Sequence, residues 1–220
     1  MKKAVAKQAT QGRLITICTM LAAAMLLFGC ARKGPVLVDF AYVAPKGAPA
    51  AAPKATVAVS AFKDDRGKVA SVVGKRFTEL SEQTNDLVVQ GTVVDRVNEA
   101  LKTALTSRGF TEKDAPAWNL AEEAIPATGT DLLLGGEIKA LWIETTASLA
   151  KITAKADVQL RIVVADPAQK KIVRVLNVNS KVERQAVTYS SAFVQKTVSE
   201  ALTTAIDQVF LDTELKSRLQ

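Results

Sequence analysis

The chain of 220 residues lacks histidine altogether and has only two cysteines, Cys18 and Cys30. Histidine is the commonest general base and the commonest metal ligand, so its absence argues against most hydrolytic and metal-dependent sites. Aromatic residues make up only 5% of the chain, and two tryptophans, Trp118 and Trp142, are too few for a tryptophan-rich glycan groove. We therefore predict a protein that is not an enzyme and needs no metal or cofactor.

The first 29 residues have no acidic side chain. Four basic residues precede an apolar run over residues 14–31; they are Lys2, Lys3, Lys7 and Arg13. A basic leader followed by a short apolar core is typical of a secretory signal peptide. The core is shorter than the ~20 apolar residues that a bilayer crossing needs. We therefore expect residues 1–29 to be a signal peptide that is removed.

The apolar run ends in Leu27-Phe28-Gly29-Cys30, which resembles the lipobox of bacterial lipoproteins. In that class cleavage falls before the cysteine, whose thiol takes a diacylglyceryl group and whose new amine is acylated. The resemblance therefore implies lipidation at Cys30, although Phe28 differs from the small or β-branched residue usual at that place. Ala31 follows instead of an aspartate. By the sorting of enterobacterial lipoproteins, this implies an anchor in the outer membrane, with the chain facing the periplasm.

Loss of the leader would lower the net charge from +7 to +3, because the leader holds four basic residues and no acidic one. A strongly basic surface for nucleic acid is therefore not expected, and we predict no nucleic-acid partner. The mature chain would keep no free thiol and no disulfide once Cys30 is acylated. Its core alone would then have to hold the domain together.

Residues 30–55 are predicted to be the lipidated N-terminus and a tether rich in alanine and proline. Residues 35–43 form an extended candidate or a short edge strand, because apolar side chains alternate at Val36, Val38, Phe40 and Tyr42. Three prolines then exclude a helix and favour a stiff linker; they are Pro45, Pro49 and Pro53. We place the periplasmic domain at residues 56–220.

Within the domain, apolar periodicity predicts strands at residues 56–62, 132–145, 149–164 and 172–184, and helices at 91–108 and 191–210. Residues 63–91 show no clean period and are predicted as a long loop with at most a small hairpin. The strands carry one polar face, so one face of the sheet should be wet. The predicted fold is an α/β (α+β) two-layer sandwich of order β-α-β-β-β-α. Its sheet is mostly antiparallel, with two helices on one face.

Two polar clusters and the tryptophans are the candidate sites. Asp64-Asp65-Arg66 can bind a divalent cation or support acid–base chemistry, or it can be a turn that Arg66 ties down. The neighbouring basic residues, among them Lys75 and Arg76, can meet lipid phosphates or an acidic partner, or can be solvated loop charges.

Trp142 is predicted to face the core with Ile138 and Ala140. Trp118 is predicted to be an exposed anchor, with a core position as the alternative. The candidate partner contacts are Arg66, Lys75, Arg76 and Trp118.

Four pieces follow the lipobox in a fixed order; they are Val57-Ala58-Val59, Asp64-Asp65-Arg66 with Gly74 downstream, residues 97–110 (VNEALKTALTSRGF) and residues 131–138 (DLLLGGEI). In this order the pieces resemble the YajG-like bacterial outer-membrane lipoproteins. The resemblance implies a periplasm-facing lipoprotein without an assigned enzymatic activity. It covers roughly residues 54–211, and the Ala/Pro-rich tether has no counterpart in it.

We therefore expect a non-catalytic binding module in the cell envelope that is anchored through Cys30 and contacts another envelope protein. Two alternatives remain at this point. The domain can be a lipid-handling auxiliary of an envelope transport system, or an activator of a peptidoglycan synthase. Both rest on analogy with other small lipoprotein domains, and fold alone does not decide among them.

Overall fold

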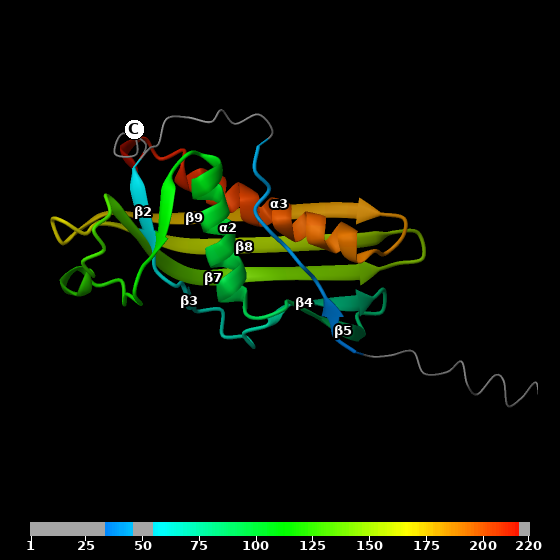
Figure 1. Ribbon diagram of the computed structural model, residues 1–220. Helices are drawn as coiled ribbons and strands as arrows, with labels where there is room; N and C mark the ends of the chain where they lie inside the picture. The colour runs from blue at the N-terminus through cyan, green and yellow to red at the C-terminus, as the bar shows by residue number, and fades with distance from the viewer. Residues whose placement is uncertain (1–33, 46–54, 216–220) are drawn as a thin grey trace, which may run out of the picture. The chain divides into compact units, whose positions relative to one another are not determined.

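A computed structural model describes residues 34–45 and 55–215, and Figure 1 shows their arrangement. The residues from Pro35 onward belong to one compact unit. The predicted signal peptide, the lipidation site Cys30 and the middle of the predicted tether lie outside the described residues. Within residues 34–45 and 55–215, neither α-helix combines the length and the apolar character that a bilayer crossing requires.

The fold is mixed α+β, as predicted, and the described strands form one nine-stranded sheet. The strands are β1 (Val36–Leu37), β2 (Thr56–Val59), β3 (Lys63–Asp64), β4 (Val72–Thr78), β5 (Gln83–Val88), β6 (Thr111–Asp114), β7 (Leu132–Ala147), β8 (Ile152–Asp166) and β9 (Lys171–Ala186). The helices are α2 (Val93–Ser107), the short 3-10 helix η1 (Glu122–Ala124) and α3 (Ser191–Val209).

The last three strands form the antiparallel meander that the alternating sequence predicted. Every second residue of β8 from Ile152 to Ile162 is buried, whereas Lys155 and Gln159 between them are exposed. We call the face of the sheet that carries Leu160 the inner face and the opposite one the outer face. The predicted register of β8 is therefore confirmed.

The other edge of β7 pairs with three short strands in succession. β2 lies beside residues 132–134, β3 beside 137–138 and β4 beside 143–147, and all three run parallel to β7. Parallel neighbours need a long crossover, and here the crossover from β4 to β7 contains α2. Five of the eight strand pairings in the described part of the chain are parallel. The prediction of a mostly antiparallel sheet is not confirmed.

The predicted order β-α-β-β-β-α also omits several strands. Residues 63–91 hold β3 and the hairpin of β4 with β5, where only a loop with at most a small hairpin was predicted. The register between β4 and β5 shifts twice, and such bulges interrupt the alternation by which a strand is recognised in a sequence. β6 pairs with β2 and consists of the four polar residues TEKD, so it has no apolar period to detect.

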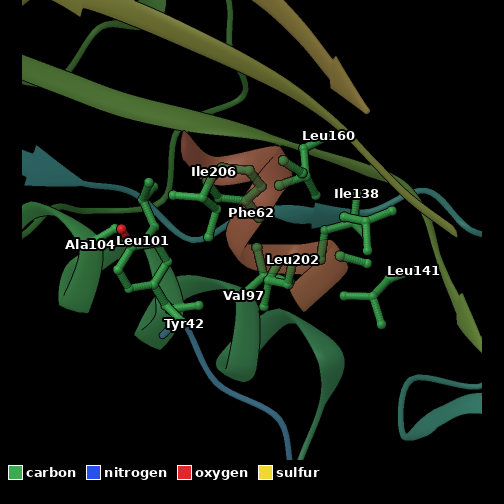
Figure 2. Packing of buried hydrophobic residues seen from close by; sticks show 14 of the residues in the cluster. Tyr42, Phe62, Val97, Leu101, Ala104, Ile138, Leu141, Leu160, Leu202 and Ile206 are labelled. Carbon is green, nitrogen blue, oxygen red and sulfur yellow. The ribbon is translucent and has the colours of Figure 1, made fainter. Parts of the chain in front are cut away.

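Both α-helices pack their apolar stripes against the inner face, as predicted. Thr92 caps α2 in a capping box with Asp95, and Ser190 caps α3 by accepting from the amide of Phe193. Gly109 follows α2 with φ +84°, a conformation that favours glycine. Figure 2 shows Leu101 of α2, Leu202 and Ile206 of α3, and Ile138 and Leu160 of the sheet in one apolar cluster.

One end of the outer face is covered, which the sequence did not predict. Trp118 and Ile125 pack there against residues of β2, β7 and β8 in a second apolar cluster that includes Leu133 and Val163. Gly135 makes this close packing possible, because a Cβ at that position would lie 2.9 Å from the side chain of Leu120 and 3.0 Å from that of Trp118. The outer face is therefore open only along the rest of its length.

A bulge in β7 changes which of its residues face the helices. Ile138 lies opposite Leu160, whereas Ala140 lies opposite Gln159, so Lys139 is the extra residue. Beyond Lys139 the side chains therefore change faces: Leu141 and Ile143 are buried on the inner face, and Trp142 lies on the outer face. The prediction that Trp142 shares the inner face with Ile138 was wrong for this reason.

The segment before the proline-rich linker packs onto the domain. β1 pairs with β5, and Val38, Phe40 and Tyr42 are buried, in line with the alternation in the sequence. Farther along, the amides of Ala41 and Val43 donate to hydroxyl oxygens of α3. Residues 35–43, which the sequence analysis assigned to the tether, are therefore part of the folded unit.

Candidate binding surface

The uncovered part of the outer face is the candidate site, and Trp142 lies within it. The indole is half-buried, and its Nε1 donates a hydrogen bond of 3.0 Å to Glu144 Oε1. Lys68, in the loop between β3 and β4, places its Nζ 5.2 Å from the centre of the indole ring. The ring is thus held in place while part of it remains accessible, which suits a contact in an interface.

A hollow of about 400 Å³ borders Trp142; its lining residues are Glu144, Lys155, Ala156, Asp157, Lys181, Val182, Glu183 and Trp142 itself. The charges around it pair across the strands. Lys155 lies 3.4 Å from Glu183, and Lys181 lies 3.7 Å from Asp157. These exposed ion pairs contribute little stability, but they leave the face without a strong charge of one sign. Such a surface suits a protein partner better than a polyanion.

Of the predicted partner contacts, Lys75 is the one that lies on this open face. It is on β4 opposite Glu144 of β7, and its Nζ donates to Gln83 Oε1 at 2.8 Å. Lys75 therefore extends the site from Trp142 toward the β4–β5 hairpin.

Arg66 does not face a partner, because its side chain is only 2% exposed. Its Nε and Nη2 donate to the two carboxylate oxygens of Asp64, each at 2.8 Å, and its Nη1 donates to the carbonyls of Val72 and Leu141. These hydrogen bonds hold the pKa of Asp64 below its usual range. The prediction of Arg66 as a partner contact is therefore corrected, and the alternative, a turn that Arg66 ties down, is what the structure has.

Arg76 lies on the inner face, where it is opposite Thr145 of β7. Its guanidinium carbon is 3.9 Å from the centre of the Tyr189 ring, and Tyr189 is partly buried against the core. Arg76 is therefore not part of the open face around Trp142. The expectation that it joins Lys75 in one basic contact surface is corrected, because adjacent residues of a strand point to opposite faces.

Trp118 is 7% exposed, and its Nε1 donates to the carbonyl of Ala121 at 2.8 Å. It packs in the second apolar cluster, so it is not an exposed anchor. The core position that the sequence left open as an alternative is the observed one.

Two serine–lysine spacings of the Ser-x-x-Lys kind occur in the sequence, at Ser60 with Lys63 and at Ser148 with Lys151. The hydroxyl of the buried Ser60 donates to the carbonyl of Pro116 at 2.9 Å. Lys151 Nζ donates to Gln185, 3.3 Å away. In the described hydrogen bonds, neither lysine amine meets the serine hydroxyl that a nucleophilic mechanism would need it to activate.

The sequence contains one signal that favours an outward Trp142. Glu144 follows two residues later and so shares the face of Trp142. Had this face been the inner one, Glu144 would be a buried carboxylate without a counter-charge, which is strongly unfavourable. Alternation read from Leu141, Ile143 and Thr145 would have placed the tryptophan correctly.

A second hollow lies on the helical side, between the N-terminal segment and α3. Its volume is about 600 Å³, and its lining includes Phe40, Val43, Ala192 and Thr203. The backbone of the segment forms one wall, because the amide of Ala41 donates to Ser199 Oγ at 3.2 Å and that of Val43 to Thr203 Oγ1 at 3.0 Å. The lining also includes Asp39, Lys196 and Glu200, so the groove combines apolar surface with charged side chains.

No family model and no curated protein matches the chain. Among solved structures, a Xanthomonas campestris protein of the family DUF330 is similar, with 11% identity and a TM-score of 0.53. The match covers 84% of this chain and 96% of that protein. The lipoprotein GNA1162 of Neisseria meningitidis matches with 12% identity, 72% and 99% coverage and a TM-score of 0.36. A PelC dodecamer of Paraburkholderia phytofirmans has 14% identity, 71% and 91% coverage and a TM-score of 0.38.

The likeness to the Xanthomonas protein is one of fold alone, because the identity is so low. The other two structures are too distant for an argument about this chain, although one of them is a lipoprotein. These comparisons do not name the YajG-like family, and that resemblance stays a prediction.

Proposed function

We propose that the protein is a lipoprotein anchored in the outer membrane through Cys30, and that its periplasmic domain binds another envelope protein without catalysing a reaction. The anchor rests on the basic leader, the short apolar run and the sequence Leu27-Phe28-Gly29-Cys30. The position of Ala31 after the cysteine favours the outer membrane. A host that carries out lipoprotein processing should attach labelled palmitate to the chain, and Cys30→Ala should abolish the label.

The observation that supports a binding role is the open outer face around Trp142. Sheet faces in a domain of this kind are usually either packed or covered with polar side chains. Here a half-buried tryptophan lies beside a hollow on an otherwise polar face whose charges already pair with one another. Tryptophan is among the residues that most often carry binding energy at the centre of an interface.

A non-catalytic role is supported by the state of the polar groups. The sequence has no histidine. In the cluster Asp64-Asp65-Arg66, the carboxylate of Asp64 accepts from Arg66, and that of Asp65 accepts from Lys139 at 2.6 Å. The serines at Ser-x-x-Lys spacing donate to backbone carbonyls. A reaction turned over by the pure domain would overturn this part of the proposal.

One observation favours a second candidate, the lipid-handling auxiliary. The groove of about 600 Å³ along α3 is lined in part by apolar residues such as Val43 and Ala192, which suit an acyl chain. Native mass spectrometry of the mature chain, released gently from detergent, separates the two functions. A stoichiometric lipid beyond the covalent anchor favours lipid handling. A bare chain that crosslinks to one envelope protein in cells favours the interaction module.

A further inference from the structure

The three most exposed large apolar side chains of the described residues all lie in turns between elements. Leu149 is 102% exposed, Val187 is 85% exposed and Leu80 is 83% exposed. Leu149 is in the β7–β8 turn, Val187 in the connection from β9 to α3, and Leu80 in the β4–β5 turn. Single exposed apolar residues are common on soluble proteins, so their position relative to one another decides their meaning.

These three turns are neighbours at one end of the sheet. The strand residues next to them form one row, because Thr78 pairs with Ala147, Ala147 with Ile152, and Ile152 with Ala186. Adjacent strands are ~4.8 Å apart, so the row of four strands is about 15 Å wide. Figure 1 shows the three turns together at the end of the sheet where α3 begins. We call this end, defined by Leu80, Leu149 and Val187, the turn end.

The turn end carries little net charge. Glu79 and Glu82 are in the β4–β5 turn and Lys151 is in the β7–β8 turn, while the connection from β9 to α3 contains no charged residue. Three apolar side chains on such a surface favour an apolar partner. The turn end has no excess of positive charge that would attract anionic groups.

The covalent chain restricts what can lie near the turn end. Because Val36 is paired with Leu87, only six peptide units separate the domain from Cys30, and they reach at most about 20 Å. β1 runs parallel to β5, and β5 begins beside the turn end. The N-terminal side of β1 therefore faces the turn end. Because residues 35–43 pack onto the domain, about six residues connect Cys30 to the folded domain, instead of the twenty-six of the predicted tether.

We propose that the turn end rests on the lipid bilayer and that Leu80, Leu149 and Val187 insert into its interface. This inference rests on the lipid anchor at Cys30 proposed above. The three side chains alone bury too little apolar surface for stable membrane binding, but a protein already held by acyl chains needs only such a secondary contact to fix its orientation. The open face around Trp142 would then extend away from the membrane surface into the periplasm and remain available to a partner.

The test uses the full lipoprotein in vesicles of phosphatidylethanolamine and phosphatidylglycerol. The acylated Cys30 cannot react with a spin label, so a label enters only at an introduced cysteine, either Leu149→Cys or, as the control, Leu211→Cys. Leu211 is 75% exposed and lies just after α3, whose nineteen residues place it about 28 Å from the turn end. Collision with oxygen and with a water-soluble nickel complex reports the depth of each label.

We expect the label at Leu149→Cys to lie about 5–10 Å below the headgroups and the label at Leu211→Cys to stay in water. Adding Leu80→Ser and Val187→Ser should return the first label to water without a change in the thermal midpoint, because both side chains are exposed. Salt should not change the depth.

Two labels in water on vesicle-bound protein would overturn the contact and leave the anchor intact. Dipolar broadening between Leu149→Cys labels would mean that the turn ends of two copies meet, and would also overturn it. Protein that fails to bind vesicles, with Cys30 itself reacting, would overturn the anchor and this inference together.

Discussion

Arg66 donates a hydrogen bond of 3.3 Å from Nη1 to the carbonyl oxygen of Leu141, in the stretch of β7 that lies between its pairings with β3 and β4. The same nitrogen donates to the carbonyl of Val72, 2.8 Å away at the start of β4. One guanidinium therefore donates to a carbonyl of β7 and to a carbonyl of β4, just before the pairing of these two strands begins at Gly74 and Ile143. The carboxylate of Asp64 fixes its orientation.

Replacing Arg66 by alanine should be severely destabilising. It would leave the carboxylate of Asp64 without its counter-charge and two carbonyls without a donor, and breaking a buried ion pair typically costs about 3–5 kcal/mol. The matched control is Arg161→Ala, because Arg161 is 34% exposed and lies 3.5 Å from Glu137. That pair is half-buried, but it is long and Glu137 keeps Lys139 as a second partner at 2.9 Å, so it should contribute less than about 1 kcal/mol. Urea melts of both variants measure the difference, and similar losses would show that Arg66 does not close the sheet.

The stability should also depend on the protonation of Asp64. The hydrogen bonds from Arg66 lower the pKa of Asp64 in the folded state relative to the unfolded chain, where it is about 4. A lowered pKa contributes stability that is present above the unfolded value and is lost as the pH falls through the folded value. Asp65, Asp95 and Asp212 also have lowered pKa values, so the test is a difference between two proteins.

We expect the free energy of unfolding of the wild type to fall more steeply below pH about 4 than that of Asp64→Asn. Denaturant melts at a series of pH values from neutral to acid give both curves. Two curves that stay parallel through this range would mean that Asp64 gains nothing from Arg66 on folding.

Leu160→Ala tests the register of β8. The side chain is 2% exposed in the apolar cluster on the inner face, and large-to-small changes at such positions cost about 2–5 kcal/mol. Gln159→Ala, one residue away on the exposed outer face, should cost under about 0.5 kcal/mol. Thermal or urea melts of the two variants compare the faces directly. Equal losses would mean that the outer face is covered at Gln159 and is not free for a partner.

The sequence predicted the parts of the fold where a pattern runs unbroken for many residues. The alternation of β8 and the stripes of α2 and α3 follow this rule, and their caps at Thr92 and Ser190 are local. The bulge at Lys139 interrupts the alternation of β7, because one extra residue moves Trp142 to the other face. No residue type in this stretch signals the bulge. Strands such as β3 and β6 are short, so their pairing depends on partners more than fifty residues away.

The candidate site was likewise predicted only in part from the sequence. Lys75 lies on the open face, whereas Arg66 and Trp118, whose prediction as contacts rests on residue type alone, are buried. Charge and aromatic character do not show whether a side chain is already occupied by its own fold. The burial of Val38 and Phe40 was indicated by their alternation, but the neighbouring prolines favoured a tether.

Tyr42 should hold the N-terminal segment on the domain. Its hydroxyl accepts from Arg108 at 2.6 Å and donates to Asp207 at 2.8 Å, and burial raises its pKa. Tyr42→Phe should cost about 1.5–3 kcal/mol, because both partners are charged. It should also speed amide exchange at Ala41 and Val43.

Tyr189→Phe is the matched control for that prediction. The Tyr189 hydroxyl is buried and has no hydrogen-bond partner among the described residues, so its removal should be neutral or slightly stabilising. A loss at Tyr189→Phe as large as that at Tyr42→Phe would contradict the role given to the Tyr42 network. Unchanged exchange at Ala41 would contradict the docking of the segment.

We propose that the open outer face around Trp142 binds an envelope protein. A photoreactive amino acid placed at Lys155, which lines the hollow beside Trp142, tests it in living cells. The control position is Glu99 on α2, whose side chain is 67% exposed on the helical side. We predict a crosslink to one envelope protein from position 155, no such product from position 99, and loss of the product when Trp142→Ala is added to a chain that still melts cooperatively. Equal crosslinking from both positions, or a product that survives Trp142→Ala, would show that this face is not the binding surface.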